Sequence, residues 1–287
     1  MFLIRCKMLI SKNNIIKGKH GKPILLDYGY FPNGTKKPVV VFTHGFKGFK
    51  DWGHFNMIME YFIENGFAFI KFNFSHNGGT AEQPIDFPDL EAFGNNNYTK
   101  ELDDLRSVVN WLETNNEIPT EEIDVNQIYL IGHSRGGGVS ILAANEDDRV
   151  KKLICWAPVS DLINRFDKEL MDDWKKAGVI YVPNVRTNQQ MPMYYQLVAD
   201  TLKNKDRFNI EKAATELSIP HLIIHGTADE AVNVSEGMDI HKWNKDSEIL
   251  IIEEANHTFG TFHPYNEDSF PDDVKIVLEK TLAFLKS

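Results

Sequence analysis

The sequence has few cysteines and no long apolar run. Only Cys6 and Cys155 occur among 287 residues, and neither belongs to a Cys-x-x-Cys pair, so nothing indicates a disulfide framework or a cysteine-based zinc site. No stretch approaches the roughly 20 consecutive apolar residues that a membrane-spanning helix needs. The apolar N-terminal stretch, residues 1–10, is broken by Arg5 and Lys7 and lacks a following small-residue cleavage site. We therefore predict a first strand there rather than a signal peptide.

The sequence also lacks an excess of basic residues. It has 31 lysines and arginines against 41 acidic residues, for a net charge of −10. Nucleic-acid backbones and anionic membranes bind basic patches, so we predict that neither is a partner, and we expect a monomer or a homodimer. The histidines and acidic residues show none of the spacings of metal ligands, so we expect no metal and no cofactor. The cysteine usage favours a cytoplasmic location, with export after removal of a signal segment as the alternative.

Apolar runs and amphipathic stretches alternate along the chain. The runs that predict strands lie at residues 24–31, 39–43, 67–72, 128–131, 152–157, 221–225 and 248–252. The stretches that predict helices lie at residues 54–64, 100–113, 135–145, 235–243 and 271–285. Residues 73–99 are rich in Gly, Asn, Pro and Asp, which predicts a long loop. This alternation predicts an α/β fold with a doubly wound, mostly parallel sheet.

Residues 162–217 interrupt the alternation, because they separate two sheet strands that a single helix could join. Within them, residues 179–185 and 187–193 predict a β-hairpin. Long insertions near active sites are often lids. We therefore predict a single domain of residues 1–287 with a small lid at residues 162–217. We expect the lid residues Trp174, Tyr181 and Tyr194 to contact the substrate, although aromatic side chains also serve packing.

The most informative motif begins at the end of a short apolar run. The segment Ile131-Gly132-His133-Ser134-Arg135-Gly136 contains Gly-x-Ser-x-Gly, and small residues then open a predicted helix. This strand–turn–helix context is typical of a nucleophile elbow, which presents a serine hydroxyl beside backbone N–H groups. A serine becomes an effective nucleophile only when a base takes its proton. Ser134 therefore requires a histidine and an acid from elsewhere in the chain.

Two histidines follow the last predicted strand. His257 comes directly after residues 248–252, on the loop at the carboxyl end of that strand, and His263 lies farther along the same loop. Open α/β sheets bind ligands at this edge, where the elbow serine also lies. We therefore predict His257 as the base, with His263 as the alternative.

The candidate acid is Asp229, which closely follows the predicted strand at residues 221–225. It too lies at the carboxyl edge, and the order Ser134, Asp229, His257 is that of α/β hydrolases. The acid would fix the tautomer of the base and stabilise its charged form. Asp161 and Glu230 are the alternative acids.

Oxyanion donors are expected from two backbone N–H groups. One belongs to the residue after the nucleophile, Arg135. The other is assigned to Phe46, in the loop after residues 39–43, where Gly45 and Gly48 allow the backbone to turn. Nearby histidines are assigned structural roles, which are backbone hydrogen bonding for His44 and His133 and packing for His225.

These motifs together resemble the α/β-hydrolase superfamily over nearly the whole chain. The segments that carry the resemblance are His44-Gly45-Phe46-x-Gly48 and Gly132-His133-Ser134-x-Gly136-Gly137. Within the superfamily they look like the prolyl-oligopeptidase-like and dienelactone-hydrolase-like branch, and are particularly similar to bacterial feruloyl (cinnamoyl) esterases. The resemblance implies a lid inserted after the sixth core strand, and the same triad and oxyanion donors as above. The chain departs from those esterases at Arg135, where they often have Gln.

We therefore predict a serine hydrolase that cleaves small carboxylic esters, including aromatic or feruloyl-type esters, through an acyl-enzyme on Ser134. One alternative is a peptidase or amidase of the prolyl-oligopeptidase type. It would need an anchor for a peptide terminus, and the only adjacent acidic pair in the lid is Asp172-Asp173. The other alternative is a non-catalytic binding protein with the same fold.

Overall fold

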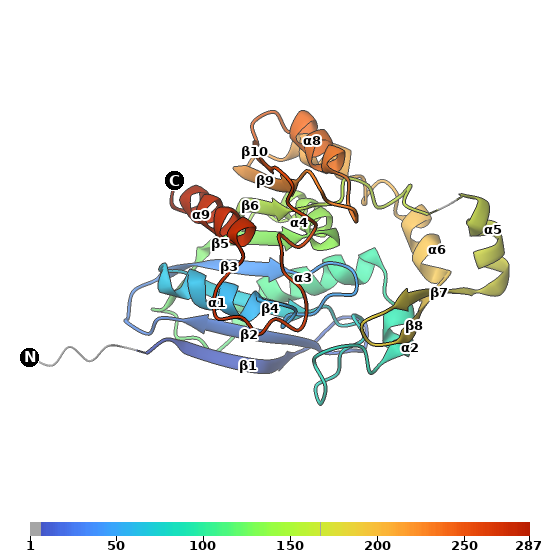
Figure 1. Cartoon of the computed structure of the whole chain (residues 1–287). Coiled ribbons are helices and arrows are strands. Elements are labelled where there is room, and N and C mark those ends of the chain that lie inside the picture. Colours follow the sequence, from blue (N-terminus) through green and yellow to red (C-terminus); the bar gives the residue numbers. More distant parts are fainter. Residues whose placement is uncertain (1–6, 167) are drawn as a thin grey trace, which may run out of the picture.

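The computed structural model describes residues 7–166 and 168–287. The strand predicted at residues 1–10 therefore falls largely outside the described residues, as does Cys6. Within the described residues the main sheet has eight strands in the order β1-β2-β4-β3-β5-β6-β9-β10 (Figure 1). The strands of this sheet are β1 (Leu9–Ile16), β2 (Ile24–Tyr30), β3 (Lys37–Thr43), β4 (Ala68–Asn73), β5 (Ile123–His133), β6 (Val150–Trp156), β9 (His221–Gly226) and β10 (Glu248–Ile252).

Most of this sheet is parallel, as its sequence predicts. Strand β2 pairs antiparallel with both β1 and β4, while the pairs from β4 across to β10 are parallel. The central strands read as continuous apolar runs because helices cover both of their faces. Val39, Val40 and Val41 of β3, for example, are fully buried. The prediction of a doubly wound, mostly parallel sheet is confirmed.

Helices cover the two faces of the sheet. Apolar residues of α1 and α9 belong to one core cluster, and those of α3, α4, α7 and α8 belong to the other, on the opposite face. Phe55, Ile58, Met59 and Phe62 of α1 are buried, as the helical spacing of the sequence predicts. The helices are α1 (Phe55–Glu64), α2 (Leu90–Gly94), α3 (Tyr98–Thr114), α4 (Arg135–Glu146), α5 (Lys168–Ala177), α6 (Gln196–Lys203), α7 (Ile210–Glu216), α8 (Val234–Trp243) and α9 (Asp272–Lys286).

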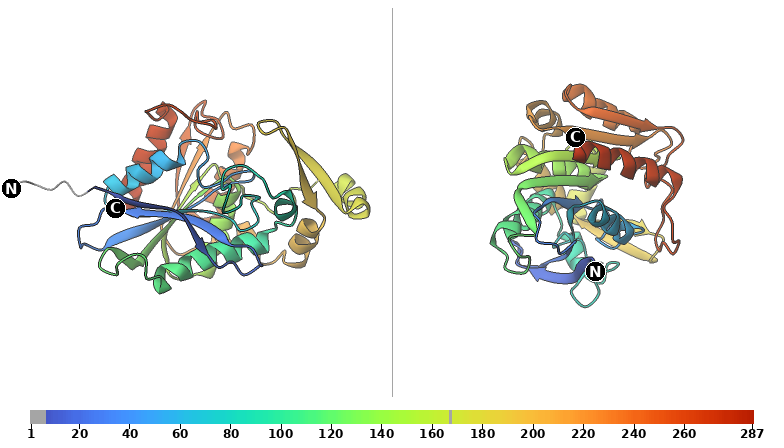
Figure 2. Two further views of the ribbon diagram at one scale, coloured as in Figure 1. Left: turned by 90° about the horizontal axis from the view of Figure 1, so that it is seen from below. Right: turned by 90° about the vertical axis from the view of Figure 1, so that its left-hand side faces the viewer.

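The insertion at residues 162–217 follows β6, the sixth strand of the main sheet. It carries α5, α6, α7 and a hairpin of β7 (Val179–Asn184) and β8 (Gln189–Tyr194). The predicted hairpin is therefore present with nearly the expected bounds. Most of the insertion lies at one end of the sheet, beyond the helices that flank it, as the yellow segments of Figure 2 show. Strand β8 packs against α2, a short helix inside the segment predicted to be a long loop.

Parallel strands bring their carboxyl ends to one edge of a sheet, so the loops that follow them meet there. The loops after β3, β5, β9 and β10 carry Phe46, Ser134, Asp229 and His257, respectively. The fold alone therefore gathers the predicted site residues at one edge.

Candidate active site

Ser134 lies at a sharp turn between β5 and α4. Its backbone has φ 58° and ψ −124°, a conformation that residues other than glycine rarely adopt. Hydrogen bonds stabilise the turn, because the Ser134 N–H donates to the carbonyl oxygen of Trp156 (2.9 Å) and the Gly137 N–H donates to the carbonyl oxygen of Ser134 (2.9 Å). Strained backbone of this kind recurs at functional sites. The geometry is that of a nucleophile elbow.

Gly132 makes the elbow possible, because a Cβ there would lie 2.4 Å from the carbonyl oxygen of Gly136. Backbone atoms cannot move aside as a flexible side chain can. We expect Gly132→Ala to lower the free energy of unfolding by about 1–3 kcal/mol, the usual cost of overpacking. Urea denaturation measures the effect. An unchanged midpoint would show that the elbow has room for a methyl group.

His257 and Asp229 form a direct pair. Nδ1 of His257 lies 2.7 Å from Oδ2 of Asp229, whose side chain is fully buried while that of His257 is 20% exposed. Because a carboxylate only accepts hydrogen bonds, Nδ1 carries the proton and Nε2 stays free to accept one. The backbone N–H groups of Ala231 and Val232 donate to Oδ1 of Asp229 and fix its orientation. This is the arrangement that a histidine base requires.

The surroundings of Asp229 favour its ionised form. Burial by itself would raise the pKa of this carboxyl, but hydrogen bonds from His225, His257 and the Val232 N–H outweigh burial and lower it well below the ordinary value. The acid therefore remains charged at neutral pH. A charged Asp229 can stabilise a protonated His257 electrostatically.

The sequence predicts only a packing role for His225, but the structure also places its ring against Asp229. Its ring is fully buried, and Nε2 lies 3.2 Å from Oδ2 of Asp229 and 2.9 Å from the carbonyl oxygen of Val232. Oδ2 of Asp229 thus contacts two histidines, His225 and His257. The spacing of four residues between His225 and Asp229 was the available signal. It carries little information until the turn after β9 is known.

The alternative site residues have other partners. His263 accepts a hydrogen bond from the Gly53 N–H (2.9 Å) and packs against Phe49 and Trp52. The carboxylate of Asp161 accepts hydrogen bonds from the backbone N–H groups of Ile163 and Asn164. Glu230 is exposed. Among the described residues only Asp229 pairs with His257.

His133 contacts the backbone of His257. Nε2 of His133 donates to the carbonyl oxygen of His257 (2.9 Å), and the two rings lie 4.8 Å apart. Burial, with His257 as a second cause, lowers the pKa of His133 to about 3, so the ring is neutral. His44 is likewise buried and bonded to the backbone at Gly45, with a pKa lowered by burial to about 4. Both histidines therefore organise the loops that surround Ser134.

The loop after β3 passes close to Ser134. A Cβ on Gly45 would lie 2.8 Å from Cβ of Ser134, so only glycine permits this approach. The Gly48 N–H donates to the carbonyl oxygen of Gly45, which closes the turn that contains Phe46 and Lys47. Arg135 opens α4, and the first N–H groups of a helix have no acceptor within it. The structure thus brings the two predicted oxyanion segments to the same side chain.

Four charged side chains, three of them buried and Asp51 partly buried, hold this loop against the sheet. The ammonium of Lys71 lies 2.7 Å from Asp27 and 2.5 Å from Asp51, and that of Lys50 lies 2.8 Å from Asp27 and 2.5 Å from Asp51. Burial would raise the pKa of Asp51, but Lys71 and Lys50 together lower it to about 2. Asp27 belongs to β2 and Lys71 to β4, while Lys50 and Asp51 belong to the loop. We call these residues the charge quartet; two positive and two negative charges balance within it.

Two cavities meet at Ser134 and His257. The first, of about 420 Å³, extends toward Trp52, His263 and Arg186. The second, of about 560 Å³, extends under the insertion and is mostly apolar, with Phe166, Leu170, Trp174, Ile180 and Met193 among its lining residues. Phe46 and Lys47 line both cavities. Substrate pockets commonly have volumes in this range, roughly 300–1,000 Å³.

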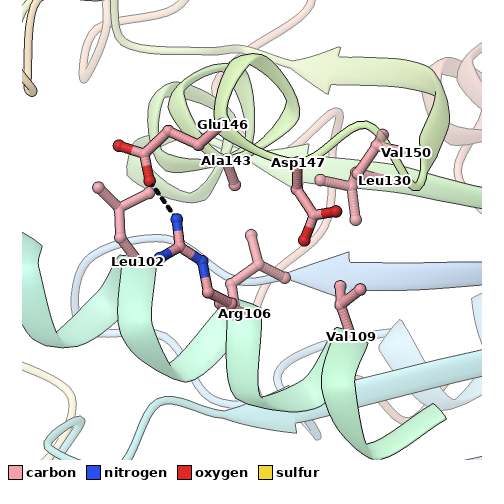
Figure 3. A pocket seen from close by; sticks show the side chains of 9 residues that line it. Leu102, Arg106, Val109, Leu130, Ala143, Glu146, Asp147 and Val150 are labelled. Atoms are coloured by element: carbon pink, nitrogen blue, oxygen red, sulfur yellow. Dashed lines mark hydrogen bonds and ion pairs between the residues drawn. The ribbon is translucent and has the colours of Figure 1, made fainter. Parts of the chain in front are cut away.

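Other features are too small or too sparse to be sites. A cavity of about 10 Å³ lies between α3 and α4, beside the ion pair of Arg106 and Glu146 (Figure 3), and has no room for an organic ligand. Within residues 7–166 and 168–287, no three histidine, cysteine or acidic side chains are grouped as metal ligands. No helix in the same part of the chain is both long and apolar enough to span a bilayer.

With this geometry in hand, comparison with known proteins identifies the family. Residues 53–274, more than half of the chain, match the model of the prolyl oligopeptidase family. The chain belongs to the prolyl oligopeptidase family.

Curated relatives match over shorter segments. The quorum-quenching protein AidA of Acinetobacter baumannii is 24% identical over 124 residues, which are 43% of this chain and 36% of AidA. An uncharacterized 31.7 kDa protein of Escherichia coli is 31% identical over 136 residues, 45% of this chain and 41% of that protein. Less than half the length of either relative is matched.

Solved structures resemble this prolyl oligopeptidase family member along almost its full length. Est1E from Butyrivibrio proteoclasticus, solved with bound ferulic acid, has a TM-score of 0.71 at 20% identity and covers 95% of this chain and 98% of its own. The α/β hydrolase GrgF from Penicillium has a TM-score of 0.67 at 20% identity and covers 98% of each chain. A dienelactone hydrolase from Anabaena variabilis has a TM-score of 0.64 at 16% identity and covers 97% of each chain. These likenesses confirm the predicted α/β-hydrolase fold, and the family match confirms the predicted prolyl-oligopeptidase-like branch.

The three predicted substrate contacts of this family member separate into two groups. Trp174 lines the larger cavity, and its Nε1–H donates to the carbonyl oxygen of Met193 (2.8 Å). Tyr181 is 60% exposed, and Tyr194 contacts Glu91 and Gly94 of α2. Residues of a hairpin alternate between its faces, and Ile180 and Met193, which pair with one another, occupy the cavity face. Tyr181 and Tyr194 lie on the other face, so Trp174 alone of the three lines the larger cavity.

Arg135, where this family member departs from the esterases it resembles, has a defined environment. Its guanidinium lies 2.6 Å from Glu101 and stacks on the ring of Phe46, 4.7 Å from the ring centroid. Glu101 is almost fully buried, so Arg135 compensates a charge that would otherwise be costly. The side chain thereby links α4 to the loop that carries Phe46.

Proposed function

We propose that this protein is a serine hydrolase that cleaves small carboxylic esters through an acyl-enzyme on Ser134. The observation that carries the proposal is the His257–Asp229 pair at 2.7 Å, whose histidine lines the same two cavities as the strained elbow serine. A nucleophile, a base and an orienting acid at one cavity are the parts that acyl transfer needs.

The proposed reaction has two halves. Oγ of Ser134 attacks the acyl carbon while Nε2 of His257 takes the hydroxyl proton, and the N–H groups of Phe46 and Arg135 stabilise the negative oxygen that forms. The intermediate collapses to the acyl-enzyme, and His257 returns the proton to the departing alcohol. Water then repeats the sequence: His257 takes its proton, the acid leaves, and Ser134 regains its hydrogen. Asp229 stabilises the charged imidazole in both halves without taking the proton.

Two cavities suit two parts of an ester. One can take the acyl group and the other the alcohol, with the scissile bond at Ser134 where they meet. The apolar lining of the larger cavity, including Trp174, favours apolar or aromatic groups there. The likeness to an esterase structure with bound ferulic acid supports the same substrate class.

The family also contains peptidases, so cleavage of a peptide or amide bond is the second candidate. A peptidase that recognises a free amino terminus needs an acidic anchor near the serine. Asp172 and Asp173 are exposed, and neither they nor any other acidic side chain among the described residues lines the two cavities. The charge of the site therefore favours ester cleavage over the removal of amino-terminal residues.

A fluorophosphonate probe tests the proposal directly, because it reacts with a serine only when a base activates it. We expect stoichiometric labelling of the purified protein at Ser134, mapped by mass spectrometry, and no labelling of Ser134→Ala. We also expect turnover of p-nitrophenyl acetate and much slower turnover of p-nitroacetanilide, which carries the same acyl group on an amide. Unlabelled wild-type protein would exclude the serine mechanism, while faster anilide cleavage would favour the amidase.

A further inference from the structure

The charged side chains that line the two cavities are all basic. Lys47, Arg135, Arg165 and Arg186 contribute to their walls, whereas no aspartate or glutamate among the described residues does so. The basic lining contrasts with the whole sequence, in which acidic residues outnumber lysines and arginines by 41 to 31. The charge of the site is therefore a local property and not a consequence of the overall charge.

Each of the three arginines is neutralised by an acid outside the cavities. Arg135 pairs with Glu101 at 2.6 Å, and Arg165 pairs with Glu236 at 2.9 Å. Arg186 pairs with Asp86 in the segment between β4 and α2. These arginines contribute hydrogen-bond donors to the walls but little net charge.

Lys47 differs from the arginines. Its ammonium donates to the carbonyl oxygen of Pro183 (3.1 Å) and lies 5.7 Å from the ring centroid of Phe46, and no acidic side chain within residues 7–166 and 168–287 forms an ion pair with it. It also lines both cavities, next to the loop position assigned to the oxyanion. Lys47 is thus an uncompensated positive charge at the junction of the two cavities.

The backbone at Lys47 supports a functional role. Its φ is 53°, in the left-handed region that favours glycine. A lysine there costs conformational energy, and strained positions of this kind cluster at ligand-binding sites. Burial also lowers the pKa of Lys47, as expected for an ammonium without a carboxylate beside it. A bound anion would supply the missing charge.

We propose that the preferred substrates of this site are esters that carry a carboxylate, and that Lys47 binds that carboxylate. The inference rests on the proposed ester hydrolysis and names the class of ester. Because Lys47 borders both cavities, the carboxylate could belong to the alcohol part or to the acyl part, and the experiment separates these cases.

Two substrate pairs of equal shape and different charge provide the test. On the alcohol side, 4-acetoxybenzoate is compared with 4-acetoxybenzamide, and on the acyl side monomethyl adipate is compared with methyl adipamate. We expect a higher kcat/KM for the anion in at least one pair. We expect Lys47→Met to lower the ratio of anion to amide by about 10- to 100-fold, as for loss of a hydrogen bond to a charged group. The ratio should also fall with added salt.

The ratio separates charge recognition from a general loss of activity, because both members of a pair use the same catalytic residues. Lys245→Met, which removes an exposed lysine after α8, should leave the ratio unchanged. Lys47→Glu should invert the preference. A ratio near one in both pairs for the wild type, or a wild-type ratio retained by Lys47→Met, would overturn the inference and leave ester hydrolysis intact.

Failure of the proposed ester hydrolysis would give a different result from failure of the charge preference. The fluorophosphonate probe would then not label Ser134, and none of the four esters would turn over. Calorimetric binding of 4-acetoxybenzoate and 4-acetoxybenzamide to Ser134→Ala reports charge preference without any chemistry. Tighter binding of the anion that disappears when Lys47→Met is added supports the inference. Equal binding of acid and amide contradicts it.

Discussion

Asp229→Asn is expected to lower kcat for a simple ester by about 10⁴-fold, with a small change in KM. The carboxylate of Asp229 accepts a hydrogen bond from Nδ1–H of His257 (2.7 Å). An asparagine that turns its NH₂ toward the ring favours the opposite tautomer, in which Nε2 carries the proton and cannot accept one from Ser134. Loss of the corresponding acid in serine proteases has an effect of this size. An interaction that matters only in the transition state appears in kcat.

Steady-state kinetics on p-nitrophenyl acetate measure this loss, and thermal unfolding checks that the variant is folded. The matched control is Glu230→Gln, which removes the neighbouring exposed carboxylate and should leave kcat within about two-fold. A loss of less than about ten-fold for Asp229→Asn would mean that another group orients His257. His225 should not rescue the variant, because it contacts Asp229 and not His257.

Asp27→Asn is expected to lower the free energy of unfolding by about 3–5 kcal/mol, the usual cost of breaking a buried ion pair. Asp27 accepts from Lys71 at 2.7 Å and from Lys50 at 2.8 Å, and its side chain and both lysines are at most 1% exposed. Without its charge, two buried ammonium groups share only Asp51. Two like charges in a medium of low polarity repel one another and lack hydration.

Urea denaturation measures this loss. The control Asp246→Asn, at an exposed carboxylate, should change stability by less than about 0.5 kcal/mol. The double variant Asp27→Asn/Lys71→Met leaves Lys50 and Asp51 as a balanced pair, so part of the lost stability should return. Simple additivity of the two substitutions would show that the quartet does not act as a unit.

The core of the fold follows from local patterns in the sequence. Runs such as Val39-Val40-Val41 are apolar on both faces, which only a covered strand tolerates, and the amphipathic stretches between them have no place other than the faces of a sheet. The meeting of Ser134, Asp229 and His257 can be predicted from the sequence for the same reason. Each residue follows a parallel strand, and the carboxyl ends of parallel strands meet at one edge of the sheet.

The charge quartet could not be predicted in this way. Asp27 and Lys71 each stand alone in an apolar run, where a single polar residue usually indicates an exposed face. They meet because β2 pairs with β4, a pairing between strands that are not consecutive in the sequence. The contact of His225 with Asp229 depends similarly on the turn after β9. Both features are properties of the assembled sheet.

The insertion was the least predictable part of the chain. The sequence predicts its hairpin, but which face of the hairpin meets the cavity depends on a register in which Ile180 pairs with Met193. A period of two places Tyr181 and Tyr194 on the other face. Composition showed that aromatic residues were present without showing which of them turn inward.

One continuous segment, residues 162–217, supplies about half of the apolar wall of the larger cavity and none of Ser134, Asp229 or His257. This share of the cavity wall and the residues proposed to react are thus encoded in separate stretches of the gene. Replacement of residues 162–217 during evolution would change the range of substrates, while Ser134, Asp229 and His257 would keep their positions. Homologues that share an ancestor could therefore differ in substrate range while keeping the same catalytic residues.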